Sequence, residues 1–166
     1  MTERKRTKSL NGISIIPKRI LIPTDGSENA ARAASVAIEF ARKFEAEVFV
    51  LHAIAIPAYT LALDEAGMEG LERSETREYF ALARQKAKTI VDEVVKSAEA
   101  KNVKATAIIQ ENSFSVVETI VDHATKYNVG LIVIGTRGLT GFKKLLVGSV
   151  SSGVVNHAHC SVLIVR

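Results

Sequence analysis

The sequence lacks most of the features that mark secreted and membrane proteins. It has a single cysteine, Cys160, and one cysteine excludes a framework of intramolecular disulfides. No apolar run approaches the ~20 residues that a membrane-spanning helix needs. No hydrophobic segment of the signal-peptide type follows the basic residues at the N-terminus. These absences predict a cytoplasmic protein that does not contact a membrane.

Two common nucleotide-binding motifs are also missing. The first strand is not followed by G-x-G-x-x-G, and G-x-x-x-x-G-K-[ST] occurs nowhere in the chain. The first absence argues against a dinucleotide-binding fingerprint, and the second excludes a P-loop NTPase.

An excess of positive charge is confined to the N-terminus. The net charge is +4, and the first eight residues supply +3 of it, from four basic residues against Glu3. The rest is nearly neutral, which argues against a nucleic-acid surface. We expect residues 1–17 to be a basic, flexible tail, with contact to nucleic acid or anionic lipid as a lesser alternative. Residues 18–166 fit one domain.

Apolar runs and helical stripes alternate along this domain. Short runs predict strands at 19–23, 47–53, 103–109, 131–134 and 161–166. Helical spacing predicts helices over 28–44 and 70–101, a third capped by Ser115 with Glu118, and a fourth after Gly148. Residues 54–69 are expected to form a loop, and His123 to be an exposed helix residue. The alternation predicts an α/β fold, an open five-stranded parallel sheet with helices on both faces, Rossmann-like.

The stretch from Leu131 to Ser151 carries the strongest chemical signal. A buried strand is followed by glycines spaced Gly-x2-Gly-x9-Gly-Ser, at Gly135, Gly138 and Gly148-Ser149. Glycine permits close backbone approach to an anion and φ > 0, and a helix beginning offers unpaired N–H groups. Hydroxyls at Ser149 and Ser151 add donors. The alternative is a glycine-rich surface loop before a serine-capped helix.

Three other groups of polar residues need interpretation. Asp25, at the end of the first strand, suits a ribose or metal contact equally as well as a turn or cap. His52 ends the second strand, where a hydrogen-bonded structural role is more frequent than a catalytic one. His157, His159 and Cys160 are zinc-ligand types, but three candidates within four residues make poor tetrahedral geometry. We therefore predict no metal site there, and treat Cys160 as a small buried apolar residue.

The glycine spacing, together with Pro-Thr-Asp-Gly-Ser at 23–27, resembles the universal stress protein family, and specifically its ATP-binding members. The resemblance runs from about Lys18 to Arg166. Two departures are a missing Gly-x-Pro turn after the third strand and Ser161 in place of a proline. The resemblance implies strand order 3-2-1-4-5. Ligands of such sheets bind where the order reverses, here between the first and fourth strands, so the two motifs should converge.

The resemblance also assigns roles to residues. Asp25 would hold the ribose beside Pro23 and Thr24, while the Ala53 backbone and Ile134 would border the adenine. The phosphate channel would be shaped by Gly135, Arg137 and Gly138, and the phosphate donors would be Gly148, Ser149, Val150 and Ser151.

The implied function is that of an ATP-binding stress-response or signalling protein. ATP would be bound with Mg²⁺ or Mn²⁺, and hydrolysis would be slow or partner-dependent, because no residue suggests itself as the water-orienting group. A homodimer paired through the last strand would cover its apolar edge. The alternatives are a regulator that binds AMP or a cyclic nucleotide, and a nucleotide-free interaction module of the same fold. An adenylating or ATP-pyrophosphatase-type enzyme is disfavoured, because the first turn lacks the serine- and glycine-rich loop it would need.

Overall fold

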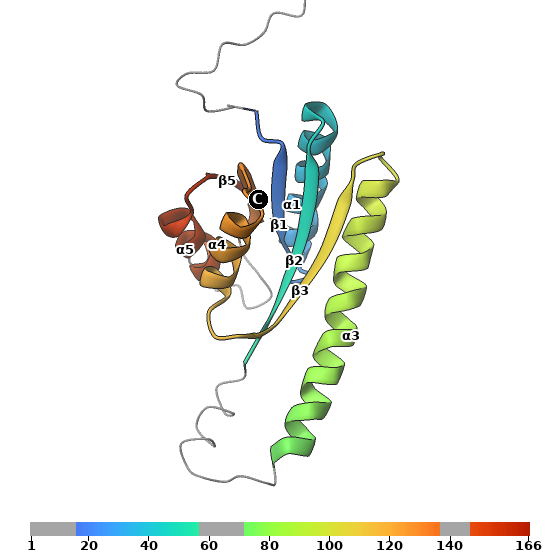
Figure 1. The fold of residues 1–166 in the computed structure, drawn as a ribbon, viewed down its shortest axis with the longest axis vertical. Coiled ribbons are helices and arrows are strands. Elements are labelled where there is room, and N and C mark those ends of the chain that lie inside the picture. Colours follow the sequence, from blue (N-terminus) through green and yellow to red (C-terminus); the bar gives the residue numbers. More distant parts are fainter. Residues whose placement is uncertain (1–15, 57–71, 137–146) are drawn as a thin grey trace, which may run out of the picture.

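The computed structural model describes residues 16–56, 72–136 and 147–166. These residues form a five-stranded sheet, all of whose neighbouring strands pair in parallel, in the order β3-β2-β1-β4-β5 (Figure 1). The predicted fold class and strand order are confirmed. In chain order the elements are β1 (Arg19–Pro23), α1 (Glu28–Phe44), β2 (Glu47–Ala55), α3 (Glu72–Glu99), β3 (Ala105–Ser113), α4 (Val116–Lys126), β4 (Leu131–Gly135), α5 (Ser149–His157) and β5 (Ser161–Val165).

Strands β2 and β3 are longer than the sequence predicts at their carboxyl ends. Ile54 and Ala55 belong to β2, although the sequence places them in a loop. Residues 111–113 belong to β3, although the sequence places them in the turn that follows. The two strands pair as far as Ala55 and Ser113 through a register shift after Ala53. Backbone pairing extends these strands past their apolar runs. The rest of the expected loop, 57–69, and most of the basic tail lie outside the described residues.

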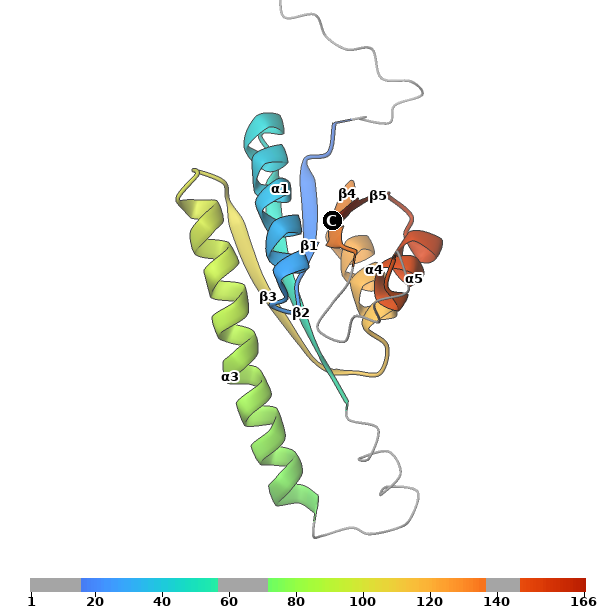
Figure 2. The same cartoon turned by 180° about the vertical axis from the view of Figure 1, so that it is seen from behind.

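The sheet is covered on both faces, as predicted. Successive side chains of a strand point to opposite faces, so β1 sends Ile20 and Ile22 toward α1 and α3, and Leu21 toward α4 and α5. Figures 1 and 2 show these two helix pairs on opposite sides of the sheet. All three of these side chains are fully buried. The apolar run of β1 therefore belongs to two cores at once.

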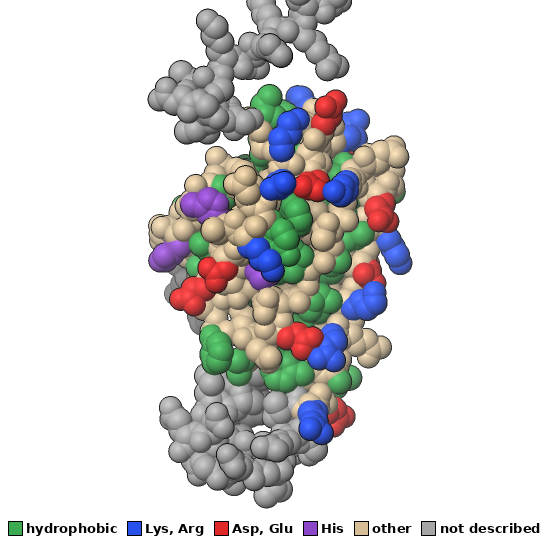
Figure 3. All heavy atoms as spheres, viewed as in Figure 1, with side chains coloured by type: hydrophobic (Ala, Val, Ile, Leu, Met, Phe, Trp, Pro, Cys, Tyr) green, Lys and Arg blue, Asp and Glu red, His purple; other side chains and the backbone are tan. Residues whose placement is uncertain are grey.

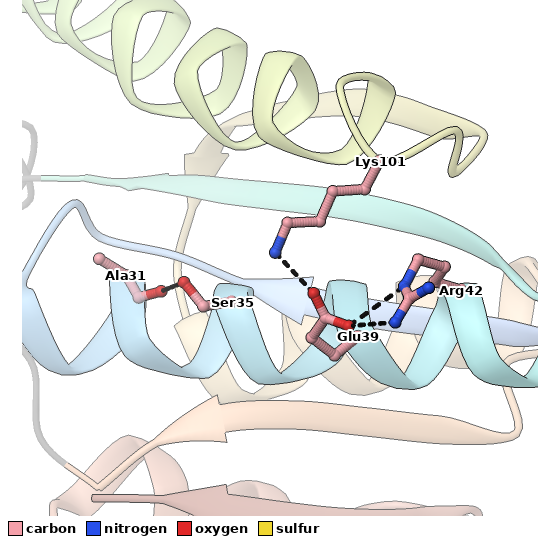
Figure 4. Close-up of polar contacts among 5 residues, drawn as sticks. All are labelled: Ala31, Ser35, Glu39, Arg42 and Lys101. Carbon is pink, nitrogen blue, oxygen red and sulfur yellow. Dashed lines mark hydrogen bonds and ion pairs between the residues drawn. The ribbon is translucent and has the colours of Figure 1, made fainter.

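Helix α1 lies close to the sheet because its buried face is mostly alanine. The side chain of Ser27 caps its first turn by accepting the Ala30 N–H (3.2 Å). On its exposed side, Glu39 is paired with Lys101 beyond the end of α3 and with Arg42 (Figure 4). Hydrogen bonds from these two cations lower the pKa of Glu39. These exposed contacts link α1 to the end of α3.

Helix α4 begins at the predicted cap, where Ser115 accepts the Glu118 N–H (3.3 Å). The prediction that His123 is exposed is wrong: its side chain is buried. Its Nδ1 lies 2.9 Å from the Thr119 carbonyl oxygen, and its ring lies 6.0 Å from that of Tyr127. Tyr127 in turn stacks on Phe49 of β2 at 4.7 Å. His123 therefore faces the sheet, which the charged sequence around it did not suggest.

The surface carries both signs of charge. In the face shown in Figure 3, lysine and arginine side chains alternate with aspartate and glutamate side chains over α3 and its neighbouring strands. Several are ion-paired, including Arg84 with Glu111 of β3 (2.6 Å) and Lys88 with Asp92 (2.6 Å). Among the helices of the described ranges, none has the length and apolar character needed to cross a membrane.

Candidate functional site

The central strands β1 and β4 part toward their carboxyl ends. β1 pairs with β2 through five residues, and β4 with β5 through five, but β1 and β4 pair only at Ile20–Leu131 and Leu21–Ile132. The residue after each strand is bonded outward: the Thr24 N–H donates to Leu51 and the Thr136 N–H to Val165, both at 2.9 Å. The strand order reverses between β1 and β4, and this is where ligands of such sheets bind.

The turn after β1 is held by its own side chains. The Gly26 N–H donates to Thr24 Oγ1 (3.3 Å), and the Ser27 N–H donates to Asp25 Oδ1 (3.0 Å). Gly26 has φ +79, a left-handed conformation that favours glycine. Asp25 therefore fills a turn role, one of the interpretations that the sequence leaves open. This same bond fixes the direction of its half-buried carboxylate at the switch point.

The backbone of Ala53 faces the β1 side of β2, beyond the last residue of β1. The Glu47 N–H donates to the Lys18 carbonyl, and Leu51 accepts from Thr24, so odd-numbered residues of β2 point their polar groups toward β1. Ala53 is the next in this series. Within the described residues, no bond joins its N–H to Thr24. The polar backbone groups of Ala53 thus face the space beyond the end of β1, and the adenine-side role that resemblance assigns to Ala53 stays a prediction.

His52 is bonded to the same turn. Its Nδ1 lies 2.8 Å from the Thr24 carbonyl oxygen, and since a carbonyl only accepts, Nδ1 carries the proton. Burial lowers the pKa of His52, with the Thr24 bond and Asp25 opposing the change and Lys86 adding to it. The hydrogen bond expected for His52 is present. The sequence does not show that the hydrogen-bond partner of His52 is Thr24, the residue next to Asp25.

Gly135 is required by packing against α1. A Cβ atom there would lie 2.8 Å from the carbonyl carbon and oxygen of Asn29 and 3.1 Å from the nitrogen of Ala30. The missing side chain lets the beginning of α1 reach the end of β4. Its neighbour Ile134 is buried on the opposite face, against the core under α4 and α5. The structure thus adds an architectural requirement to the phosphate role predicted for this glycine.

The beginning of α5 is tied to the end of β4. The Gly148 N–H donates to the Thr136 carbonyl (2.7 Å), and the buried hydroxyl of Ser151 donates to the Gly135 carbonyl (2.8 Å). Gly148 has φ −73 and ψ 163, so it does not use the positive φ that glycine permits. Both of these donors bond within the protein, whereas the resemblance assigns Gly148 and Ser151 to the phosphates.

The donors that remain are the first-turn amides of α5 and the hydroxyl of Ser149. The first N–H groups of a helix have no partner within it, and no side chain caps α5. Ser149 is exposed and Val150 is half-buried. These groups form a positive helix end next to the switch point, of the kind that binds anions.

Two predicted residues, Arg137 and Gly138, lie outside the described residues.

Within the described ranges, no three histidine, cysteine, aspartate or glutamate side chains gather in a way that could hold a metal ion. Cys160 is half-buried beside the core under α4 and α5, and burial raises the pKa of its thiol. Its thiol is therefore protonated near neutral pH.

The architecture defines an open α/β protein with a switch-point site formed by a turn, a strand edge and a helix beginning. Residues 17–166 match the model of the universal stress protein family, and the chain belongs to that family. Universal stress protein MJ0531 of Methanocaldococcus jannaschii is 34% identical over 149 residues, which cover 90% of this chain and 82% of that protein.

Solved structures share the fold. The structure of hypothetical protein MJ0577 superimposes with a TM-score of 0.74 at 28% identity, covering 91% of this chain and 96% of that one. A universal stress protein from Archaeoglobus fulgidus in complex with dAMP has a TM-score of 0.64 at 21% identity, covering 92% and 100%. A universal stress protein in complex with cAMP has a TM-score of 0.61 at 22% identity, covering 91% and 98%.

The substitution Gly135→Ala should destabilise the protein without any nucleotide present. The added methyl group would push against the backbone of Asn29 and shift α1, which we expect to cost about 1–3 kcal/mol of unfolding free energy. Urea denaturation of the nucleotide-free protein measures this cost. An unchanged midpoint would show that Gly135 is not needed for packing.

Acidification should weaken the wild type more than the variant His52→Asn. Because burial lowers the pKa of folded His52, the unfolded chain takes up the proton first, near pH 6.5. The stability that the neutral ring contributes is therefore lost as pH falls from about 7 toward the lowered pKa. Thermal unfolding of both proteins between pH 7.5 and 5 tests this. Parallel curves would contradict it.

Proposed function

We propose that this protein binds ATP with Mg²⁺ or Mn²⁺ at the switch point and acts as a nucleotide-dependent stress-response or signalling protein in the cytoplasm. The observation that carries the proposal is the arrangement around the parted strands. The Ala53 backbone faces this point from β2, and the uncapped beginning of α5 faces it from the β4 side. The Ala53 backbone suits the edge of a base, and the beginning of α5 suits an anion. Together they suit a nucleotide.

The residue roles follow from this arrangement. Asp25, held by the Ser27 N–H, accepts from the ribose hydroxyls, with Pro23 and Thr24 supporting it. The first-turn amides of α5 and the Ser149 hydroxyl donate to the phosphates. Gly148 and Ser151 position that helix rather than donate through the groups already bonded to β4. Arg137 and Gly138 keep their proposed places in the phosphate channel.

A divalent cation would be held mainly by the phosphates. The described groups at the beginning of α5 are amides and hydroxyls, which suit an anion better than a hard cation. Mg²⁺ prefers oxygen ligands and keeps several waters, so phosphate oxygens and water would complete its shell. The cation neutralises phosphate charge when bound.

Hydrolysis is proposed to be slow or partner-dependent. Fast phosphoryl transfer needs a group that orients the attacking water. The polar side chains described at the end of β1 and β2 already bond to backbone: Thr24 to Gly26, Asp25 to Ser27, and His52 to Thr24.

AMP or a cyclic nucleotide is the second candidate ligand. The same helix end would bind one phosphate group, and structural neighbours have been solved with dAMP and with cAMP. A nucleotide-free interaction module is the remaining alternative, and the titration below distinguishes all three.

We also propose a homodimer through β5, the strand at one edge of the sheet. Because the Val165 carbonyl accepts from the N–H of Thr136, the residue after β4, the odd-numbered residues of β5 bond inward. The backbone groups of Val162 and Ile164 then point to the open edge, and their side chains are only half-buried. A second copy pairing there would cover this edge.

Gly148→Val tests nucleotide binding. With φ −73 and ψ 163, valine fits the backbone, so the variant should fold at a cost of about 1 kcal/mol for the altered cap. Its branched side chain would crowd the Ser149 and Val150 amides. Calorimetric titration with Mg-ATP should show a loss of about tenfold or more in affinity, roughly 1.4 kcal/mol.

The control for this titration is Asn156→Val, a β-branched substitution at the exposed far end of α5, which should bind as the wild type does. AMP and cAMP titrated in parallel identify the preferred ligand. If the wild type binds none of the three, the interaction module is the better description and the nucleotide proposal fails.

Val162→Pro tests the dimer. Proline removes an N–H that points to the open edge while leaving the bonds between β4 and β5 in place. We expect a monomer by light scattering at micromolar concentration, and a dimer for the wild type. Leu163→Pro is the contrasting variant, since it removes an inward bond and should lower the melting temperature. A monomeric wild type would refute the dimer.

A further inference from the structure

The Thr24 carbonyl is bonded to a side chain where a parallel ladder would use a backbone. Along β1 and β2, the Thr24 N–H donates to Leu51. In the alternating pattern of a parallel pair, the next bond would run from the Ala53 N–H to the Thr24 carbonyl. The structure has His52 Nδ1 at that carbonyl instead, at 2.8 Å.

Among residues 16–56, 72–136 and 147–166, the backbone of β2 beyond this point has no partner on the β1 side. Within the described residues, no hydrogen bond joins the Ala53 N–H to Thr24. On the other edge of β2, the register with β3 shifts between Ala53 and Ala55, and such irregularities are frequent next to functional sites. Ala53 therefore presents an N–H and a C=O side by side at the switch point.

A side-by-side donor and acceptor match one edge of adenine. The N–H can donate to a ring nitrogen while the C=O accepts from the exocyclic amino group. Guanine presents a carbonyl oxygen and a ring N–H at the corresponding positions, which would face the protein carbonyl and N–H with the wrong polarity. The pair thus discriminates between the two purines, provided that the backbone of Ala53 stays free.

We propose that His52 is the positioning residue of the nucleobase site. A carbonyl oxygen can accept two hydrogen bonds, so His52 acts by direction: it holds the Thr24 carbonyl toward its own ring, ends the ladder between β1 and β2 one bond early, and keeps the Ala53 backbone available to adenine. The same bond fixes the peptide that precedes Asp25, and so couples the base contact to the ribose contact. This inference rests on the proposed nucleotide function for its ligand, but not for its effect on the backbone.

Two substitutions separate the effect of the hydrogen bond from the effect of side-chain volume. His52→Phe keeps an aromatic ring of similar size and removes the donor. His52→Asn keeps an N–H near the position of Nδ1. The matched control is His157→Phe, which removes a histidine whose Nδ1 also lies 2.8 Å from a backbone carbonyl, that of Gly153, on the exposed end of α5.

The experiment has one readout with ligand and one without. For His52→Phe we expect about a tenfold or greater loss of ATP affinity, with the ATP-to-GTP preference falling toward unity. In the nucleotide-free protein, the Ala53 amide should exchange with deuterium more slowly than in the wild type, because Thr24 becomes its acceptor. His52→Asn and His157→Phe should behave as the wild type does in both readouts.

A purely structural His52 gives a different result. His52→Phe would then lower the melting temperature but keep the preference for ATP, and that outcome overturns the inference. Unchanged exchange of the Ala53 amide in His52→Phe also overturns it, whether or not nucleotide binds. A wild type that binds no nucleotide refutes the proposed function instead, and the exchange measurement still decides the role of His52 in the ladder.

Discussion

The parting of β1 and β4 is the constraint on which the rest of the structure depends. Both strands are buried on both faces, and each remains fully paired with its outer neighbour, β2 or β5. Because they pair with one another at only two positions, their carboxyl ends are free to receive other parts of the chain. The turn holding Asp25 and the beginnings of α1 and α5 all come to this place.

The glycines and hydroxyls of the family signature hold the fold together in addition to their proposed binding role. Gly135 makes room for the backbone of α1, and Ser151 ties α5 to β4. Gly148 uses its own N–H for the same purpose. A side chain that is bonded to the backbone is held in one place, and this fixes the direction in which the helix amides point. The proposed anion site therefore depends on groups that need not touch the anion.

The fold could be predicted from the sequence because apolar spacing reports burial directly. The run at 19–23 and the alanine stripe of 28–44 have the bounds of β1 and α1. Prediction failed where backbone pairing outweighed side-chain type. The polar residues Glu111 and Asn112 read as a turn, yet they lie within β3, at the irregularity between its pairs with β2 at Ala53–Gln110 and Ala55–Ser113. His123 was predicted to be exposed for a different reason: neighbouring charges on α4 conceal which face of the helix meets the sheet.

Residues close together in the chain are enough to predict the strand and helix pattern and to reveal the glycine spacing and the turn motif at 23–27. Which polar groups near the switch point are already bonded depends instead on contacts between distant parts of the chain. His52 and Thr24 are 28 positions apart, and Ser151 and Gly135 are 16 apart. A donor forms such a hydrogen bond only when folding brings an acceptor within about 3 Å of it. No local pattern in the sequence records that distance.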